Sequence, residues 1–119
     1  MYDWWRYPLV YPYSIICTDV RDYGTLSNDL NKINFNNGGS NPVITPYFVS
    51  FTFDDKYFVG KITKDPFGKK NYEGDFFMMN FKTGHQQIIK NSELDRTLSD
   101  INFKGGRTMI SIRDYGNKF

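Results

Sequence analysis

Residues 43–64 read VITPYFVSFTFDDKYFVGKITK, and this stretch decides the fold. Aromatic and β-branched residues alternate with other residues on both sides of residues 54–56, and a period of two is typical of β-strands. Asp-Asp-Lys in the middle favours a tight turn, because an Asp side chain accepts hydrogen bonds from nearby backbone N–H groups. The stretch therefore predicts a β-hairpin. Strict alternation places Val49 and Phe51 on one face of its first strand and Phe48 on the other.

Further strands are expected outward from this hairpin. Residues 75–81, DFFMMNF, are apolar on both faces, which indicates a strand that is covered on both sides. A Thr-Gly turn then leads into a returning strand at residues 86–90. Residues 14–20 and 108–115 also alternate, and they predict a first and a closing strand.

Two short helices are expected. Leu26, Leu30 and Ile33 follow one another at helical spacing after a turn. The second helix covers residues 92–101, where Ser92 is placed to cap the first turn and the apolar residues again follow helical spacing.

These elements predict a single α+β domain over residues 1–119, with an antiparallel sheet of five to six strands and two short helices on one face or end. An all-β, barrel-like meander is the alternative. Residues 1–13 form an extended, aromatic N-terminal segment, because two prolines disfavour a helix there. The hydrophobic content of 39% and the aromatic content of 18% indicate a folded chain.

Composition argues against several classes of function. The chain has 15 basic and 13 acidic residues, a formal net charge of +2, which is typical neither of strong nucleic-acid binders nor of polybasic membrane proteins. Cys17 and His85 are each the single residue of their type, so no catalytic pair, cofactor site or zinc site is expected. We expect Cys17 to be a buried, inert thiol.

No apolar run is long enough for a transmembrane helix, and no signal peptide precedes the aromatic segment. The sequence therefore predicts a cytoplasmic protein. An extracytoplasmic protein is the alternative if a signal segment has been removed.

The aromatic N-terminal segment is the first candidate binding site. Trp4, Trp5, Arg6 and Tyr7 are of the residue types that dominate protein interfaces, because they bury large areas at low entropic cost. The competing interpretation is that one tryptophan closes an end of the sheet. Neighbours on an extended segment face opposite ways, so we expect one indole to point inward and the other outward.

The second candidate site is a basic loop. Its lysines alternate with aromatic residues that could stack on bases, although acidic residues in the same stretch reduce the positive potential. The set is Lys64, Phe67, Lys69, Lys70 and Tyr72.

Residues 51–61 and 75–89 resemble one blade of a β-propeller, and the chain has room for barely two blades. The region from residue 44 to residue 103 also resembles a family of small bacterial proteins of unknown activity, some of them described as lipoproteins. The matching positions are Asp55, Lys56, Tyr57, residues 76–80 and Thr83-Gly84. The resemblance implies an antiparallel meander and no activity.

The sequence as a whole predicts a non-enzymatic protein-binding module of bacterial or phage type. It would act as an inhibitor or immunity-type protein that occludes a macromolecular partner, most simply another protein. The alternatives are a nucleic-acid-binding domain and an extracytoplasmic domain that binds a ligand or glycan. The sequence does not indicate an oligomeric state.

Overall fold

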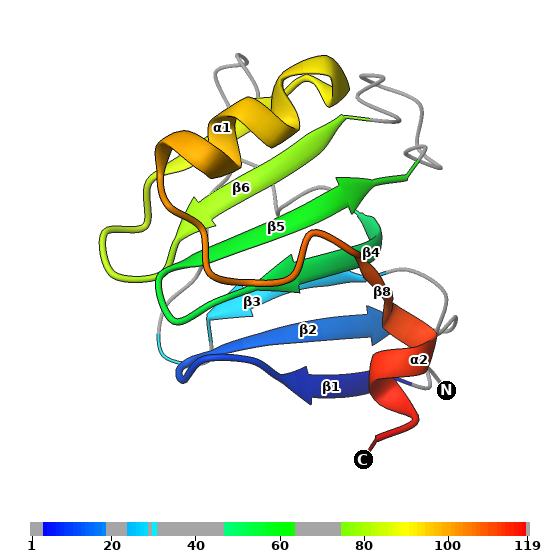
Figure 1. Ribbon diagram of the computed structural model, residues 1–119. Helices are drawn as coiled ribbons and strands as arrows, with labels where there is room; N and C mark the ends of the chain where they lie inside the picture. The colour runs from blue at the N-terminus through cyan, green and yellow to red at the C-terminus, as the bar shows by residue number, and fades with distance from the viewer. Residues whose placement is uncertain (1–3, 19–23, 29, 31–46, 64–74, 119) are drawn as a thin grey trace, which may run out of the picture.

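The computed structural model describes residues 4–18, 24–28, 30, 47–63 and 75–118, and it places their strands in two antiparallel sheets (Figure 1). The three-stranded sheet has the order β1-β2-β3, with β1 at Trp4–Pro8, β2 at Tyr13–Thr18 and β3 at Thr25–Asn28.

The five-stranded sheet has the order β7-β6-β5-β4-β8. Its strands are β4 (Phe48–Phe53), β5 (Tyr57–Ile62), β6 (Phe76–Asn80), β7 (Gln86–Ile89) and β8 (Ile110–Ser111). The helices are a 3-10 turn at Asn91–Glu93, α1 at Leu94–Asp100 and α2 at Ile112–Gly116. The α+β class is confirmed. The sequence predicted one sheet of five to six strands, whereas the described strands form a five-stranded and a three-stranded sheet, and they do not close into a barrel.

A single antiparallel bridge joins the two sheets in the described part of the chain. Gly24, just before β3, donates its N–H to the carbonyl of Phe48 at 3.0 Å and accepts the N–H of Phe48 at 2.7 Å. The bridge needs a glycine, because a Cβ at position 24 would lie 2.6 Å from the carbonyl oxygen of Ile16 on β2. Phe48 thus lies where both sheets meet.

The main core lies between the two sheets, and we call it the inner core. Alternate residues of the three-stranded sheet meet aromatic residues of β4, β5 and β6, and ring centroids such as those of Phe48 and Phe58 lie 5.1 Å apart. Its buried members are Tyr7, Tyr13, Ile15, Cys17, Leu26, Phe48, Phe51, Phe58, Ile62, Phe77, Met79, Phe81 and Ile112. Cys17 is buried, as the sequence predicted, and its inertness stays a prediction.

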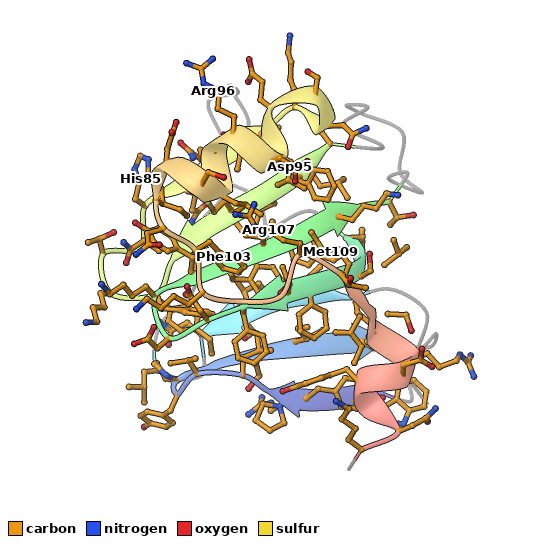
Figure 2. All side chains as sticks on the ribbon, viewed as in Figure 1. His85, Asp95, Arg96, Phe103, Arg107 and Met109 are labelled. Atoms are coloured by element: carbon orange, nitrogen blue, oxygen red, sulfur yellow. The ribbon has the colours of Figure 1, made fainter. Side chains whose placement is uncertain are left out.

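A second cluster, the outer core, covers the opposite face of the five-stranded sheet under α1. Its buried members are Val59, Phe76, Met78, Ile89, Leu98 and Phe103. The segment between α1 and β8 runs over the same face, where Phe103 and Met109 lie beside the helix (Figure 2). As the sequence predicted, β6 is therefore covered on both sides.

A β-bulge in β4 changes the predicted facing of this strand. Phe48 pairs with Ile62 and Ser50 pairs with Lys61, so Val49 is an extra residue on β4. The extra residue lets both Phe48 and Phe51 reach the inner core, although they are three positions apart. The prediction that Phe48 faces away from Phe51 was wrong for this reason.

Two other predicted elements differ from the structure. Thr25–Asn28 is a strand and not the start of a helix, because Leu26 pairs with Ile15 of β2 and packs into the inner core. The predicted closing strand ends at Ser111, whose hydroxyl accepts the N–H of Asp114 at 3.1 Å and caps α2. Ser92, in contrast, makes no capping hydrogen bond in the 3-10 turn or α1.

Helix α2 ties the C-terminal part of the chain to β1. The Tyr115 hydroxyl donates to the carbonyl of Pro8, and the Tyr115 ring meets Phe51 edge-on with centroids 5.0 Å apart. Burial raises the pKa of the Tyr115 phenol above its usual value of 10.0. The next residue, Gly116, lies directly against the ring of Tyr7, because a Cβ at position 116 would lie 2.5 Å from Cζ of Tyr7.

The contact between Gly116 and Tyr7 predicts that a Gly→Ala change in this helix destabilises the protein, the opposite of its usual effect. A Gly→Ala change in a helix interior normally stabilises a protein by about 1 kcal/mol, and a smaller gain would be expected at Gly116, the last residue of α2. Gly116→Ala should instead destabilise the protein by about 1–2 kcal/mol, because the new methyl group overpacks the Tyr7 ring. Urea unfolding of both variants measures the difference. In a Tyr7→Val background the clash is absent, so Gly116→Ala should then be neutral or stabilising; an equal loss in both backgrounds would contradict the contact.

Candidate functional site

The structure places the first predicted site on β1 and divides it between core and surface. Tyr7 is buried, Trp5 is partly buried against the inner core, and Arg6 between them is exposed. The side chain of Trp4 lies outside the described residues. Because Trp5 and Tyr7 pack inward, the exposed side of β1 in this segment is that of Arg6.

The second predicted site cannot be placed. Lys64, Phe67, Lys69, Lys70 and Tyr72 all lie in residues 64–74, outside the part of the chain that the structure describes.

Three turns that are far apart in the sequence gather at one end of the molecule (Figure 1). They follow β1, β4 and β6, and contacts link them: the rings of Tyr13 and Phe81 lie 5.0 Å apart, and the Phe81 N–H donates to the carbonyl of Lys56 at 2.8 Å. We call this surface the loop end and define it as residues 9–12, Leu30, residues 54–56, residues 82–85 and Lys104.

Asp54 organises the centre of the loop end. One carboxylate oxygen accepts the backbone N–H groups of Lys56 and Tyr57, at 2.8 and 2.7 Å, as the sequence predicted for a turn-forming Asp. The other oxygen accepts the N–H of Lys104 at 3.0 Å, from the segment that follows α1. The Asp54 carboxylate therefore fixes two segments at the loop end through their backbones and leaves the lysine side chains unconstrained by these bonds.

The β6–β7 turn is fixed in a similar way. The side-chain oxygen of Asn80 accepts the N–H groups of Lys82 and Thr83, at 2.8 and 3.1 Å. Gly84 has a φ of 77°, a conformation that favours glycine, which confirms the Thr-Gly turn. His85 follows it at the same end of the molecule (Figure 2) and is exposed.

The loop end carries the exposed apolar side chains of the described chain. Tyr11 is 79% exposed and Leu30 is 64% exposed, and they are the large hydrophobic residues that stand out on the described surface. Because Tyr13 pairs with Asn28, the turn before Tyr13 and the residue after β3 leave the three-stranded sheet at the same end. Tyr11 and Leu30 therefore belong to one side of the molecule.

Charged side chains lie on the other turns of the loop end. Lys56, Lys82 and Lys104 are all exposed, and the backbone contacts described above bring their segments together. The loop end also carries two carboxylates, those of Asp54 and Asp55. The Asp54 carboxylate accepts hydrogen bonds from backbone N–H groups, so the exposed acidic side chain is that of Asp55. The outward side of the loop end thus presents more positive than negative charge.

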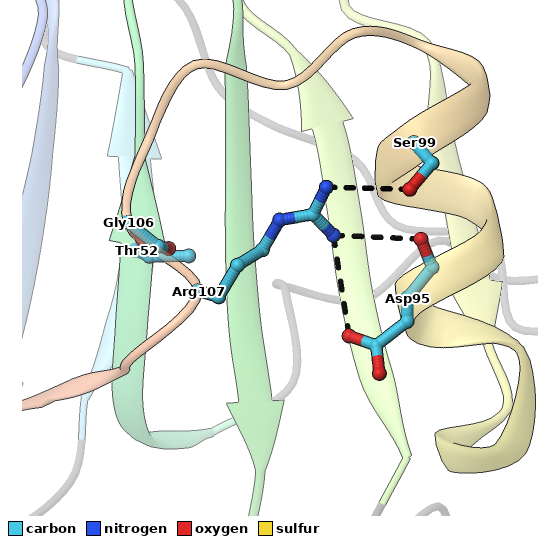
Figure 3. A network of polar contacts seen from close by, with 5 residues as sticks. All are labelled: Thr52, Asp95, Ser99, Gly106 and Arg107. Carbon is cyan, nitrogen blue, oxygen red and sulfur yellow. Dashed lines mark hydrogen bonds and ion pairs between the residues drawn. The ribbon is translucent and has the colours of Figure 1, made fainter.

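Another polar cluster lies on the α1 face, around Arg107 (Figure 3). Its guanidinium donates to the carbonyl of Asp95 and to the hydroxyl of Ser99, both at 3.4 Å, and lies 4.0 Å from the Asp95 carboxylate. The Asp95 side chain is 96% exposed, so this ion pair contributes little to stability. With the 2.7 Å bond from the Thr52 hydroxyl to the Gly106 carbonyl, the cluster holds the segment after α1 on the sheet.

The remaining candidates for catalysis or metal binding in the described part of the chain are Cys17, His85 and the acidic residues. Cys17 is fully buried and His85 is exposed at the loop end, so the two are not a nucleophile and its base. No group of three His, Cys, Asp or Glu residues in this part of the chain could hold a metal ion. The described helices are also all too short or too polar to cross a membrane.

Comparison with protein-family models, with curated proteins and with solved structures found no match to this chain.

Sequence reasoning missed Tyr11 and Leu30 as site residues. Tyr11 belongs to the aromatic N-terminal segment, but the residues around it in the sequence do not distinguish it from Tyr7, which is 4% exposed. The one available signal was Pro12, which places Tyr11 in a turn and not in a strand.

Proposed function

We propose that the protein is a non-enzymatic binding module that docks on another protein through its loop end and acts by occluding that partner. Large aromatic and aliphatic side chains in solvent are costly unless a partner covers them, and such patches commonly mark interaction sites. The observation that carries the proposal is the exposure of Tyr11 and Leu30 at one end of an otherwise well-packed core.

The construction of the loop end also supports this proposal. Binding is strengthened when the contact residues are held in place before the partner arrives, because less conformational entropy is lost. Two of the three turns are fixed by side-chain to backbone hydrogen bonds, from Asp54 and from Asn80. The third turn, between β1 and β2, is held by two backbone hydrogen bonds. The Leu9 N–H donates to the Tyr13 carbonyl, and the Tyr13 N–H donates to the Val10 carbonyl.

An inhibitor or immunity-type role is the form of this function that we propose. An occluding protein needs a rigid body behind a small contact surface, and the two cores provide such a body. Nucleic-acid binding and the binding of an extracytoplasmic ligand or glycan are the alternatives from the sequence. No set of described residues favours either of them over a protein partner.

The expected result of the central test is a loss of binding without a loss of stability. A partner is first captured with immobilised wild-type protein and then purified, so that its dissociation constant can be measured by calorimetry. Tyr11→Ala should weaken binding by about 2 kcal/mol or more, as for aromatic interface anchors, while shifting the free energy of unfolding by less than about 0.5 kcal/mol.

Arg6→Ala is the matched control, because Arg6 is the exposed residue of the aromatic segment predicted from sequence. We expect it to change binding little. If Arg6→Ala abolishes binding and both Tyr11→Ala and Leu30→Ala leave it unchanged, the partner docks on β1 and the proposed site is wrong.

A further inference from the structure

The charges at the loop end define the chemistry of its partner. Lys56, Lys82 and Lys104 reach solvent from three different segments, whereas Asp55 is the only exposed acidic residue among the loop-end residues. We propose that the loop end recognises an acidic protein surface, in which carboxylates pair with the three lysines and an apolar depression receives Tyr11 and Leu30. This inference rests on the proposed function.

Protein interfaces commonly combine apolar anchors with charged residues, and the loop end carries both kinds of exposed side chain. Rim charges of one sign steer the encounter with a partner of opposite sign, so they act mainly on the association rate. Because the backbones of Lys56 and Lys104 are held by Asp54, their ammonium groups project from a fixed base. The three charges can therefore select a partner by its charge before the apolar contacts form.

An acidic protein fits this surface better than a nucleic acid does. The exposed cations among the loop-end residues are all lysines, which act as point charges and lack the planar fork with which arginine recognises base edges. Of the two exposed apolar residues, Tyr11 offers one aromatic face and Leu30 offers none, whereas single-stranded nucleic acids bind on several successive stacking residues.

Selection of random twelve-residue peptides displayed on a surface tests the inference without a known partner. Wild-type protein should enrich peptides that combine Asp or Glu with aliphatic or aromatic residues. For synthetic versions of the enriched peptides, the triple variant K56E/K82E/K104E should reduce the association rate constant by about tenfold or more at low salt. The reduction should shrink as salt increases, because ions screen exposed charges.

The matched control reverses three exposed cations away from the loop end, as K61E/K90E/R96E, with the same change in net charge. Lys61 lies near the far end of β5, Lys90 directly follows the far end of β7, and Arg96 points outward from α1 (Figure 2). This control should leave the association rate within about twofold, because only local charges guide the final approach. If the loop-end triple variant unfolds, K56Q/K82Q/K104Q replaces it, since glutamine removes the charges without adding carboxylates beside Asp54.

Three outcomes would overturn the inference, and they differ in what they leave standing. Enriched peptides without acidic residues, whose binding still depends on Tyr11, would refute the acidic partner and keep the proposed function. No enriched peptide that depends on Tyr11 or Leu30 would refute both. A twenty-nucleotide single-stranded DNA that binds more tightly than any peptide, and is lost with the loop-end triple variant, would assign the surface to nucleic acid.

Discussion

Phe77→Ala is expected to lower the free energy of unfolding by about 3–5 kcal/mol, the usual loss for a large aromatic residue in a close-packed core. Phe77 is completely buried in the middle of β6, with its ring centroid 5.5 Å from that of Phe48. Truncation leaves a cavity where both sheets meet, and neighbouring aromatic rings cannot move enough to fill it. Urea unfolding at constant m-value measures the effect.

Tyr11→Ala removes a side chain of similar size from the surface and is the matched control. Because Tyr11 is 79% exposed, its truncation should change the free energy of unfolding by less than about 0.5 kcal/mol. A Phe77→Ala variant as stable as the wild type would mean that β6 does not face the inner core. Equal losses for both variants would mean that the loop end is part of the folded core.

The second large effect is expected at the bridge between the sheets. Gly24→Ala places a methyl group 2.6 Å from the carbonyl oxygen of Ile16 and 2.9 Å from the Cys17 sulfur. The first of these atoms is backbone in the middle strand of a sheet and cannot rotate away, so Gly24 must shift and its two hydrogen bonds to Phe48 weaken. We expect a loss of about 3 kcal/mol, at the upper end of overpacking effects.

Labelling of Cys17 with a thiol reagent reports this loss at the same place. The thiol is fully buried, so it should react only when the structure opens, and labelling should be slow in the native wild type. A loss of about 3 kcal/mol increases the open population about 100-fold and should accelerate labelling equally. Gly106→Ala is the control, since a Cβ there meets nothing closer than 3.8 Å; rapid labelling of the wild type would contradict the burial of Cys17.

Much of the five-stranded sheet could be predicted from the sequence because its signals are local. Asp54 marks the hairpin turn, Gly84 marks the next one, and both faces of β6 are apolar in the sequence as in the structure. The elements that failed depend on distant partners. Leu26 and Leu30 have helical spacing, but the pairing of Leu26 with Ile15 makes the first of them part of a strand.

The bulge and the last helix show two further reasons for error. A strict period of two cannot represent the extra residue Val49, so Phe48 was assigned to the wrong face. Ser111 and Asp114 have the spacing of a helix start, and this local signal was present but was outweighed by the alternation of Ile110 and Ile112.

The loop end could not be predicted from the sequence, because its residues come from distant segments that only the fold brings together. Lys56, Lys82 and Lys104 are separated by more than twenty residues each, and only the two hairpins and the return from α1 bring them together. Trp5 and Tyr7, in contrast, had the right composition for an interface and were needed in the core. The composition indicated the residue types of a binding surface, whereas the fold determines which individual residues of those types are exposed to solvent.

The contact of α2 with β1 constrains the order of events during synthesis of the chain. The bond from Tyr115 to Pro8 joins residues 107 positions apart, and Ile112 fills a fully buried place in the inner core. A nascent chain that has not yet released residues 110–116 from the ribosome lacks β8, α2 and this part of the core. β4, β5 and β6 can cover the three-stranded sheet earlier, but the native packing of β1 against α2 must wait until nearly the whole described chain has been synthesised.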